Sequence, residues 1–276
     1  MKIALLDSGI GLLAAAAALR ELRPDADLVL TSDPDGMPWG PRTPADVTAH
    51  ALECARAALG HRPDALVVAC NTASVHALEA IRAELEPGIP VIGTVPAVKP
   101  AAANGGPVAI WATPATTGSA YQHALIRDFA GAAEVVEVPC RGMAEAVEHA
   151  DEQAIAETVE AAVARTPAGI RGLVLGCTHY ELVADRIRAA LERSSAGRPG
   201  GSRAGSPGGP EGGVRLYGSA QAVAVQALRR VPPEASARPG SGTLVVLRSG
   251  RPEELPAAAL GYREGRLLDT AALARP

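Results

Sequence analysis

Short apolar runs alternate along this chain with longer segments in which apolar residues recur every three or four positions. Apolar runs of about four to eight residues between polar, Gly or Pro residues are typical of buried strands, and the longer periodic segments are typical of helices. The pattern predicts strands at 2–6, 26–31, 64–70, 90–95, 107–113, 133–139, 172–177, 214–219 and 242–247. It predicts helices at 11–22, 43–59, 72–85, 117–130, 152–165, 180–193, 219–230 and 252–259.

This alternation predicts an α/β fold. Strands that are apolar on both faces belong to mostly parallel sheets that helices cover on both sides. Such sheets bind ligands beyond the carboxyl ends of their strands. Residues that directly follow a strand are therefore the first candidates for a functional site.

One segment interrupts the alternation. Residues 193–212 are rich in Gly, Ser, Pro and Arg and contain too little apolar surface to offset the entropy of ordering. Because strand character resumes at 214, we expect these residues to form a flexible insertion within the fold and not a tail.

Charge and composition exclude several classes of partner. The chain has 26 basic and 30 acidic residues, without a cluster of Lys and Arg among aromatic residues, so we expect no nucleic-acid partner. No run of about eighteen apolar residues is present, so we expect no membrane span. The first 25 residues read better as strand, turn and helix than as a signal peptide. With no C-x-x-C pair among the cysteines, these features favour a cytoplasmic protein with reduced thiols.

Two segments share one arrangement: "LVVACNTAS" at 66–74 and "LVLGCTHY" at 173–180. In each, an apolar strand ends in a small residue and a cysteine, Cys70 or Cys177, and a threonine follows within two positions. A thiol between a strand and a helix meets free backbone N–H groups and the positive end of the helix dipole, which favour a thiolate. The repeat suggests two α/β lobes that face each other across a cleft.

Either cysteine alone could be a buried packing residue, which is how we interpret Cys54 and Cys140. A metal site is disfavoured because the spacing does not match zinc ligands, and no G-x-S-x-G motif indicates a serine hydrolase. Inverting an amino-acid α-carbon requires an acid and a base on opposite sides of that carbon. A thiol, with an ordinary pKa of about 8.5, can serve in either role, so Cys70 and Cys177 are candidates for such a pair.

The chain also resembles a known family, the cofactor-independent glutamate racemases of the aspartate/glutamate racemase superfamily. The matching blocks occur in family order over most of the chain: "LLDSGIG", "SDPDGMPWGPR", "VVACNTAS", "PVIGTVPA", "WATPATTGSAY", "CRGMAEAVE" and "LGCTHYELV". The resemblance implies two pseudo-symmetric lobes with the active site between them. Residues 1–96 and 213–276 would form lobe A, and residues 97–192 would form lobe B.

The resemblance also implies a set of site residues. Cys70 and Cys177 correspond to the catalytic thiols, Asp7 to the carboxylate that supports the first, and His179 to the imidazole that supports the second. Glu148 corresponds to a further acidic residue of the site. The residues that correspond to substrate-binding groups are Ser8, Pro38, Trp39, Gly40, Asn71, Thr72, Thr113, Thr116 and Thr178.

Other interpretations of three of these residues stay open. Asp7 could cap a helix, and His179 could lie on a helix surface. Glu148 could belong to a solvated face with Glu145 and Glu152.

The function that the resemblance implies is interconversion of L- and D-glutamate without cofactor or metal, supplying D-glutamate for the cell wall. The expected partners are a small amino-acid substrate and a second copy of the chain in a homodimer. The alternatives are a racemase or epimerase of another amino acid such as aspartate, a superfamily isomerase or decarboxylase acting on a dicarboxylic acid, and a catalytically weak binding or regulatory descendant.

Four positions depart from the family pattern. Leu12 stands in place of a glycine, Trp39 in place of tyrosine, Glu181 in place of proline, and Gly218 in place of an aspartate. Both thiols are retained, so we expect the proton-transfer chemistry to be kept. The identity of the amino-acid substrate is less constrained, because pocket contacts decide it.

Overall fold

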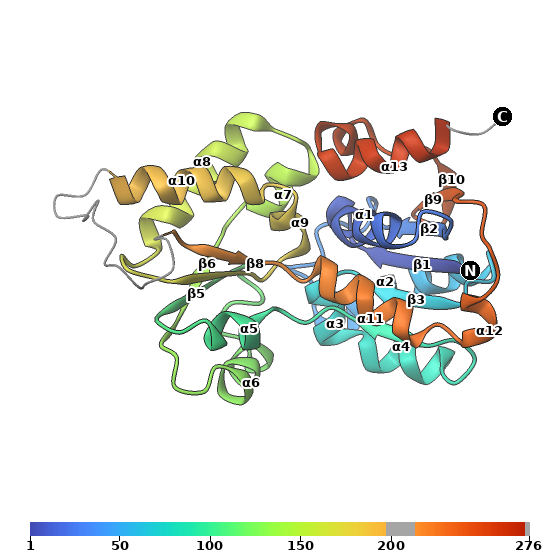
Figure 1. Ribbon diagram of the computed structural model, residues 1–276, viewed down its shortest axis with the longest axis horizontal. Helices are drawn as coiled ribbons and strands as arrows, with labels where there is room; N and C mark the ends of the chain where they lie inside the picture. Colours follow the sequence, from blue (N-terminus) through green and yellow to red (C-terminus); the bar gives the residue numbers. More distant parts are fainter. Residues whose placement is uncertain (197–212, 274–276) are drawn as a thin grey trace.

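The computed structural model describes residues 1–196 and 213–273, with side chains to residue 269. Two sheets lie side by side along the long axis of the molecule (Figure 1). The first has the strand order β10-β9-β2-β1-β3-β4, in which β10 is antiparallel to β9 and the other pairs are parallel. Its strands are β1 (Lys2–Asp7), β2 (Asp27–Ser32), β3 (Ala65–Val68), β4 (Val91–Gly93), β9 (Leu244–Arg248) and β10 (Arg251–Glu253).

The second sheet is parallel throughout, with the order β6-β5-β7-β8. Its strands are β5 (Val108–Ala112), β6 (Val135–Pro139), β7 (Gly172–Leu175) and β8 (Arg215–Tyr217). This order repeats β2-β1-β3-β4 of the first sheet, and Cys70 and Cys177 follow the equivalent strands β3 and β7. The predicted α/β fold with two similar lobes is confirmed.

Helices cover both faces of each sheet (Figure 1). Those of the first lobe are η1 (Ile10–Leu12), α1 (Leu13–Leu22), α2 (Pro44–Leu59), α3 (Asn71–His76), α4 (Leu78–Leu85), α11 (Ala220–Arg230), α12 (Pro233–Ser236), η2 (Ala257–Gly261) and α13 (Arg263–Leu273). Those of the second lobe are α5 (Val98–Ala103), α6 (Ala120–Phe129), α7 (Met143–Glu148), α8 (Glu152–Arg165), α9 (Thr178–Glu181) and α10 (Ala184–Ala196).

The apolar strands divide their side chains between the two helical layers. In β1, Ile3 and Leu5 belong to a buried cluster with α1 and α11, whereas Ala4 and Leu6 belong to another with α2, α3 and α4. This alternation follows from the period of two along a strand. The first cluster continues into the second lobe, where it includes Trp111, so one apolar core connects the two sheets.

The structure corrects three expectations. β8 lies in the second sheet, where Leu216 is in register with Leu173, although the sequence assigned it to lobe A. The strand completes that sheet before the chain returns to α11. The predicted helix at 252–259 is wrong over most of its length: after the turn at Ser249 and Gly250, both with positive φ, residues 251–253 pair with β9, and only residues 257–259 fall in the short 3₁₀ helix η2. Of the predicted insertion 193–212, residues 193–196 are the end of α10 and the others lie outside the described residues.

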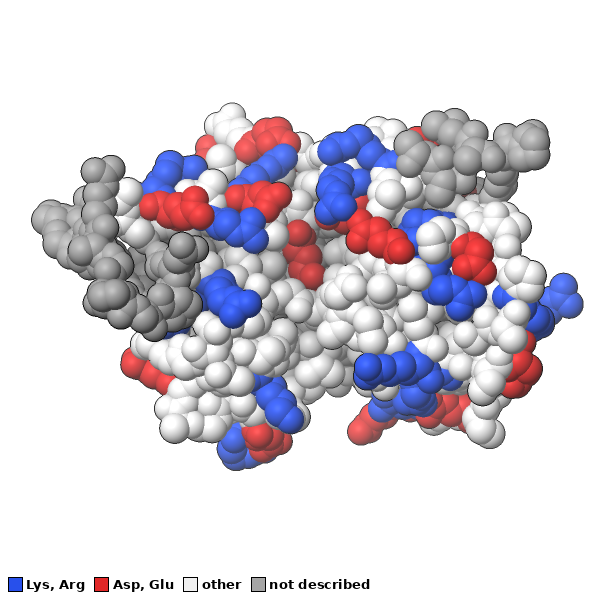
Figure 2. All heavy atoms as spheres, viewed as in Figure 1, with Lys and Arg blue, Asp and Glu red and all other residues white. Residues whose placement is uncertain are grey.

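Two observations bear on partners. On the face shown in Figure 2, basic and acidic side chains are interspersed, without a patch of one sign. Within residues 1–196 and 213–273, no helix has the length and apolar character needed to cross a membrane.

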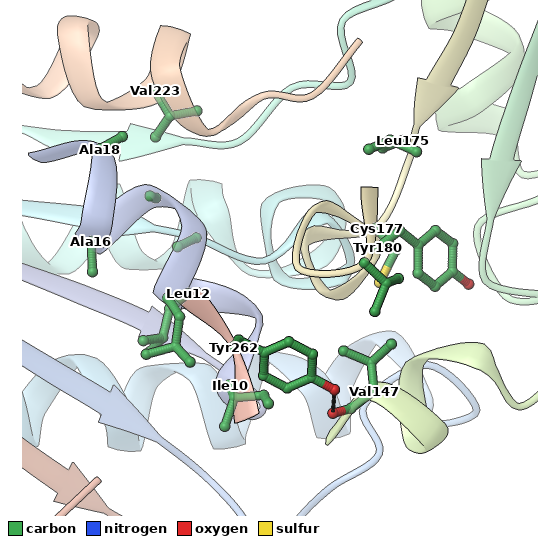
Figure 3. Packing of buried hydrophobic residues seen from close by; sticks show 14 of the residues in the cluster. Ile10, Leu12, Ala16, Ala18, Val147, Leu175, Cys177, Tyr180, Val223 and Tyr262 are labelled. Carbon is green, nitrogen blue, oxygen red and sulfur yellow. Dashed lines mark hydrogen bonds between the residues drawn. The ribbon is translucent and has the colours of Figure 1, made fainter. Parts of the chain in front are cut away.

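Tyr262 links the lobes away from the sheets. Tyr262 directly follows η2, and its hydroxyl donates a 2.6 Å hydrogen bond to the carbonyl of Val147 on α7 (Figure 3). Both residues are buried in the shared cluster, where the carbonyl also accepts a 3.1 Å hydrogen bond from the Ala150 N–H.

We predict that Tyr262→Phe lowers the free energy of unfolding by about 0.5–1.5 kcal/mol, because one buried hydrogen bond between the lobes is lost while the carbonyl keeps the Ala150 N–H. Tyr217→Phe is the matched control, since the buried Tyr217 hydroxyl has no partner among the described residues. Urea unfolding checks both variants. Equal losses of stability would show that the inter-lobe hydrogen bond contributes nothing.

Candidate active site

A cavity of about 300 Å³ lies between the lobes, beyond the carboxyl ends of β1, β3, β5 and β7. Of the predicted site residues, it is lined by Asp7, Ser8, Pro38, Trp39, Gly40, Cys70, Asn71, Thr72, Thr113, Thr116, Cys177, Thr178 and His179. Glu148 does not line the cavity but contacts His179. The structure thus brings all the residues that the sequence selected to one place.

The two thiols occupy equivalent backbone positions. Cys70 precedes α3 with φ −142° and ψ 125°, and Cys177 precedes α9 with φ −139° and ψ 136°. Both are almost fully buried, and the two sulfurs are close enough for a charge on Cys177 to raise the pKa of Cys70. The sequence repeat therefore corresponds to a repeat of local structure.

Asp7 ends β1 beside the first thiol. Its carboxylate accepts hydrogen bonds from the Ser8 N–H (2.7 Å) and the Thr178 hydroxyl (3.1 Å). Complete burial raises the pKa of Asp7. Burial, together with the charge of Asp7, raises the pKa of Cys70 well above its ordinary value. The expectation that the helix end would favour a thiolate at Cys70 is corrected, since burial and the neighbouring carboxylate act in the opposite direction and outweigh it.

His179 stands beside the second thiol. Its Nδ1 lies 3.9 Å from the Cys177 sulfur, and its Nε2 lies 2.9 Å from Oε2 of Glu148. Burial lowers the pKa of His179, but the hydrogen bonds to Cys177 and Glu148 raise it more, so the pKa lies well above its ordinary value. Because His179 is only 3% exposed, the alternative that it lies on a helix surface is wrong.

Glu148 connects the lobes. Its Oε2 accepts a 2.7 Å hydrogen bond from the Ile10 N–H of the first lobe, and the same oxygen contacts His179 of the second. Its side chain is 13% exposed, which contradicts a solvated helical face.

Two glycines of "DSGIG" leave the space in which side chains of the second lobe approach the turn after β1. A Cβ at Gly9 would overlap the Glu148 carboxylate. A Cβ at Gly11 would overlap side-chain atoms of Asp7, Thr178 and His179. The glycines are required because side chains of the second lobe pack against the backbone at these positions.

Among the polar groups that line the cavity, one side chain has no hydrogen-bond partner within the described residues, and two others contact each other. The Asn71 side-chain amide is buried, and neither its nitrogen nor its oxygen has a partner among the described residues. Buried amides are almost always hydrogen-bonded, so this one is available to a ligand. The hydroxyls of Thr113 and Thr116 lie 3.2 Å apart at the other side of the cleft.

The sequence missed other residues of the cavity wall, namely Met37, Pro41, Pro114, Ala115, Cys140, Arg141, Gly142, Ala144, Glu145 and Gly176. Cys140, interpreted from the sequence as a packing residue, is buried but borders the cavity, and burial raises its pKa to about 12. Its position directly after β6 was the available signal. Arg141 and Glu145 add charges of opposite sign to the wall.

The departures from the family pattern have local explanations. Leu12 does not crowd the turn but is buried in the apolar cluster with Ile10 and Tyr262 (Figure 3). Glu181 caps α11, where its carboxylate accepts from the Ser219 N–H and hydroxyl, both at 2.8 Å. A Cβ at Gly218 would overlap that carboxylate, so these two departures depend on each other.

Comparison with known proteins decides the family. A model of the family described as Asp/Glu/Hydantoin racemase matches residues 12–227. The chain belongs to this family. The glutamate racemase of Roseiflexus sp. (strain RS-1) is 39% identical over 195 residues, which cover 68% of this chain and 70% of that protein. The glutamate racemase of Pectobacterium carotovorum is 35% identical over 196 residues, 67% of each chain.

Solved structures of this racemase family share the fold. The structure of Escherichia coli glutamate racemase in complex with L-glutamate and the activator UDP-MurNAc-ala has a TM-score of 0.74 and 26% identity, covering 94% of this chain and 91% of that one. The Thermus thermophilus glutamate racemase has a TM-score of 0.70 and 29% identity, covering 94% and 92%. The resemblance inferred from the sequence blocks is confirmed.

We predict that Glu148→Gln lowers the pKa of His179, because a carboxylate that stabilises the imidazolium is lost. NMR titration of the histidine-labelled protein measures this pKa. Glu145→Gln, on the same helix but without contact to His179, should leave the pKa unchanged. An unchanged or higher His179 pKa in Glu148→Gln would contradict the assigned contact.

Proposed function

We propose that this protein interconverts L- and D-glutamate by moving a proton between the two faces of the α-carbon, with Cys70 and Cys177 as the acid and base. The observation that carries this proposal is the pair of buried thiols at equivalent strand ends of two lobes, both lining one cavity. The glutamate racemases among the relatives support glutamate as the substrate.

The two thiols differ in their partners, and this difference suits them to different roles in one direction of the reaction. His179 lies beside Cys177, where an imidazolium stabilises negative charge on the sulfur. Burial and Asp7 raise the pKa of Cys70, which favours its protonated form. In this direction we therefore assign the base to Cys177 and the acid to Cys70.

In one direction, the Cys177 thiolate takes the α-proton, and the C–H electron pair becomes the lone pair of a carbanion delocalised into the carboxylate. Cys70 then gives its proton to the opposite face and is left as a thiolate. The reverse reaction exchanges these roles. Glu148 holds His179 in place throughout and stabilises its charge.

The remaining polar groups of the cavity would hold the substrate. The unpartnered amide of Asn71 and the hydroxyls of Ser8, Thr72 and Thr178 line the cavity together with the two thiols and are suited to the amino-acid head. Thr113 and Thr116, with the loop of Pro38, Trp39 and Gly40, would surround the side chain.

The biological setting is part of the proposal. We propose that the protein supplies D-glutamate for peptidoglycan in the cytoplasm and acts as a homodimer; its similarity to glutamate racemases supports the supply of D-glutamate. Gel filtration with light scattering would test the dimer.

Incubation with L-glutamate in deuterium oxide should yield D-glutamate carrying deuterium at the α-carbon. Chiral chromatography with mass spectrometry measures both the inversion and the isotope. Inversion of aspartate but not of glutamate, or reaction only with dicarboxylic acids that lack an amino group, would contradict the proposed substrate.

Cys70→Ser and Cys177→Ser should each lower the racemisation rate by about 100- to 10,000-fold, the usual contribution of a general acid or base. Cys54→Ala is the control, because Cys54 is buried in α2 and does not line the cavity. Full activity in either serine variant would exclude that thiol from the reaction.

A further inference from the structure

The indole of Trp39 forms part of the cavity wall. Trp39 lies in the loop between β2 and α2, lines the cavity and is only 1% exposed. Its Nε1–H donates a 3.0 Å hydrogen bond to Oδ2 of Asp33, which is not a lining residue. The polar edge of the indole is therefore engaged behind the wall, and the ring can present only apolar surface to the substrate.

Asp33 directly follows β2 and collects hydrogen bonds from three segments of the first lobe. Oδ1 accepts from the Gly36 N–H (3.1 Å) and the Ser249 hydroxyl (3.2 Å). Oδ2 accepts from Trp39 and lies 2.8 Å from Nδ1 of His50 on α2. With four partners and 7% exposure, this carboxylate joins the Trp39 loop, α2 and the turn between β9 and β10.

The loop is shaped around this carboxylate. A Cβ at Gly36 would overlap Oδ2 of Asp33 and the His50 ring, so the close approach requires glycine. The Trp39 and His50 rings are 6.5 Å apart between centroids, which places the indole against α2. The indole is consequently fixed on two sides, by a hydrogen bond and by packing.

We propose that Asp33 is a positioning residue that determines specificity: by fixing the Trp39 indole in the wall, it limits the length of the amino-acid side chain that the cavity accepts. This inference rests on the proposed racemase function. The cavity volume of about 300 Å³ is at the low end for ligand sites, so a shift of the largest side chain in its wall changes the space for substrate substantially.

The test compares L-glutamate with L-2-aminoadipate, which is longer by one methylene. Rejection of one methylene by an apolar pocket amounts to about 10- to 200-fold in kcat/KM. Asp33→Asn keeps the size of the side chain, but only one of its two terminal atoms can accept, so the amide cannot satisfy both the Trp39 indole and the Gly36 and Ser249 donors. We expect the preference for glutamate to fall by about 10-fold or more, mainly through KM, with kcat nearly unchanged.

Trp39→Phe tests whether Asp33 acts through the indole, and it carries the test if Asp33→Asn does not fold. It should relax the preference in the same way. In the double variant, Asp33→Asn should add nothing to the effect of Trp39→Phe on the glutamate preference, because the hydrogen bond is already lost. Multiplicative effects would overturn the inference.

Asp27→Asn is the matched control at the opposite end of β2. Asp27 also accepts four hydrogen bonds, from the N–H groups and hydroxyls of Ser241 and Thr243, but it does not line or contact the cavity wall. It should reduce stability without changing the KM for glutamate. A change of preference in Asp27→Asn equal to that in Asp33→Asn would show a general loss of structure.

¹⁹F NMR of the 5-fluorotryptophan-labelled protein gives a readout that does not depend on activity. The chain has two tryptophans, and Trp111, bonded to Thr166 in the second lobe, serves as the internal reference. Asp33→Asn should shift or broaden the Trp39 resonance and leave that of Trp111 unchanged.

The outcomes separate the two proposals. If the unaltered protein racemises glutamate but Asp33→Asn leaves the Trp39 resonance or the preference for glutamate unchanged, only the inference is overturned. Failure of the unaltered protein to racemise any amino acid would overturn the proposed function and the inference with it.

Discussion

The contact between the turn after β1 and helix α9 determines whether the two lobes share one site. Across it, Asp7 accepts from Thr178, and Glu148 reaches from α7 to a backbone N–H of the first lobe. Gly9 and Gly11 leave the space that these side chains fill. Around this polar contact the apolar core runs without interruption from one lobe to the other, so the hydrogen bonds are made away from water, where leaving one unsatisfied is costly. The lobes are thereby held at the separation that places both thiols on one cavity.

The chemistry depends on a difference within this symmetry. Cys70 and Cys177 have nearly the same backbone conformation and burial, but one faces the carboxylate of Asp7 and the other the imidazole of His179. In a low-dielectric site these partners act in opposite directions on a sulfur charge. A pseudo-symmetric scaffold with unlike partners can therefore hold an acid and a base opposite each other without a further group.

Much of this organisation could be predicted from the sequence. Each predicted strand is present because buried parallel strands leave continuous apolar runs, and the Cys70 and Cys177 repeat indicated both lobes and the cleft. What failed depends on tertiary contacts: β8 is too short to reveal which sheet it joins, and the turn at Ser249 converts a helical pattern into a strand pair. The linked roles of Glu181 and Gly218 could not be predicted either, and nor could the role of Asp33 behind Trp39. Both arise from contacts between segments distant in sequence.

In the proposed mechanism, Cys70 and Cys177 act on opposite faces of one α-carbon. The most direct measurement follows, by NMR, the loss of the α-proton from L- and D-glutamate in deuterium oxide, with Cys70→Ser and Cys177→Ser as catalysts. Because each variant retains one thiol, the two-sided mechanism predicts that one variant exchanges only L-glutamate and the other only D-glutamate. Exchange of the same enantiomer by both variants, or of both enantiomers by either one, would contradict it.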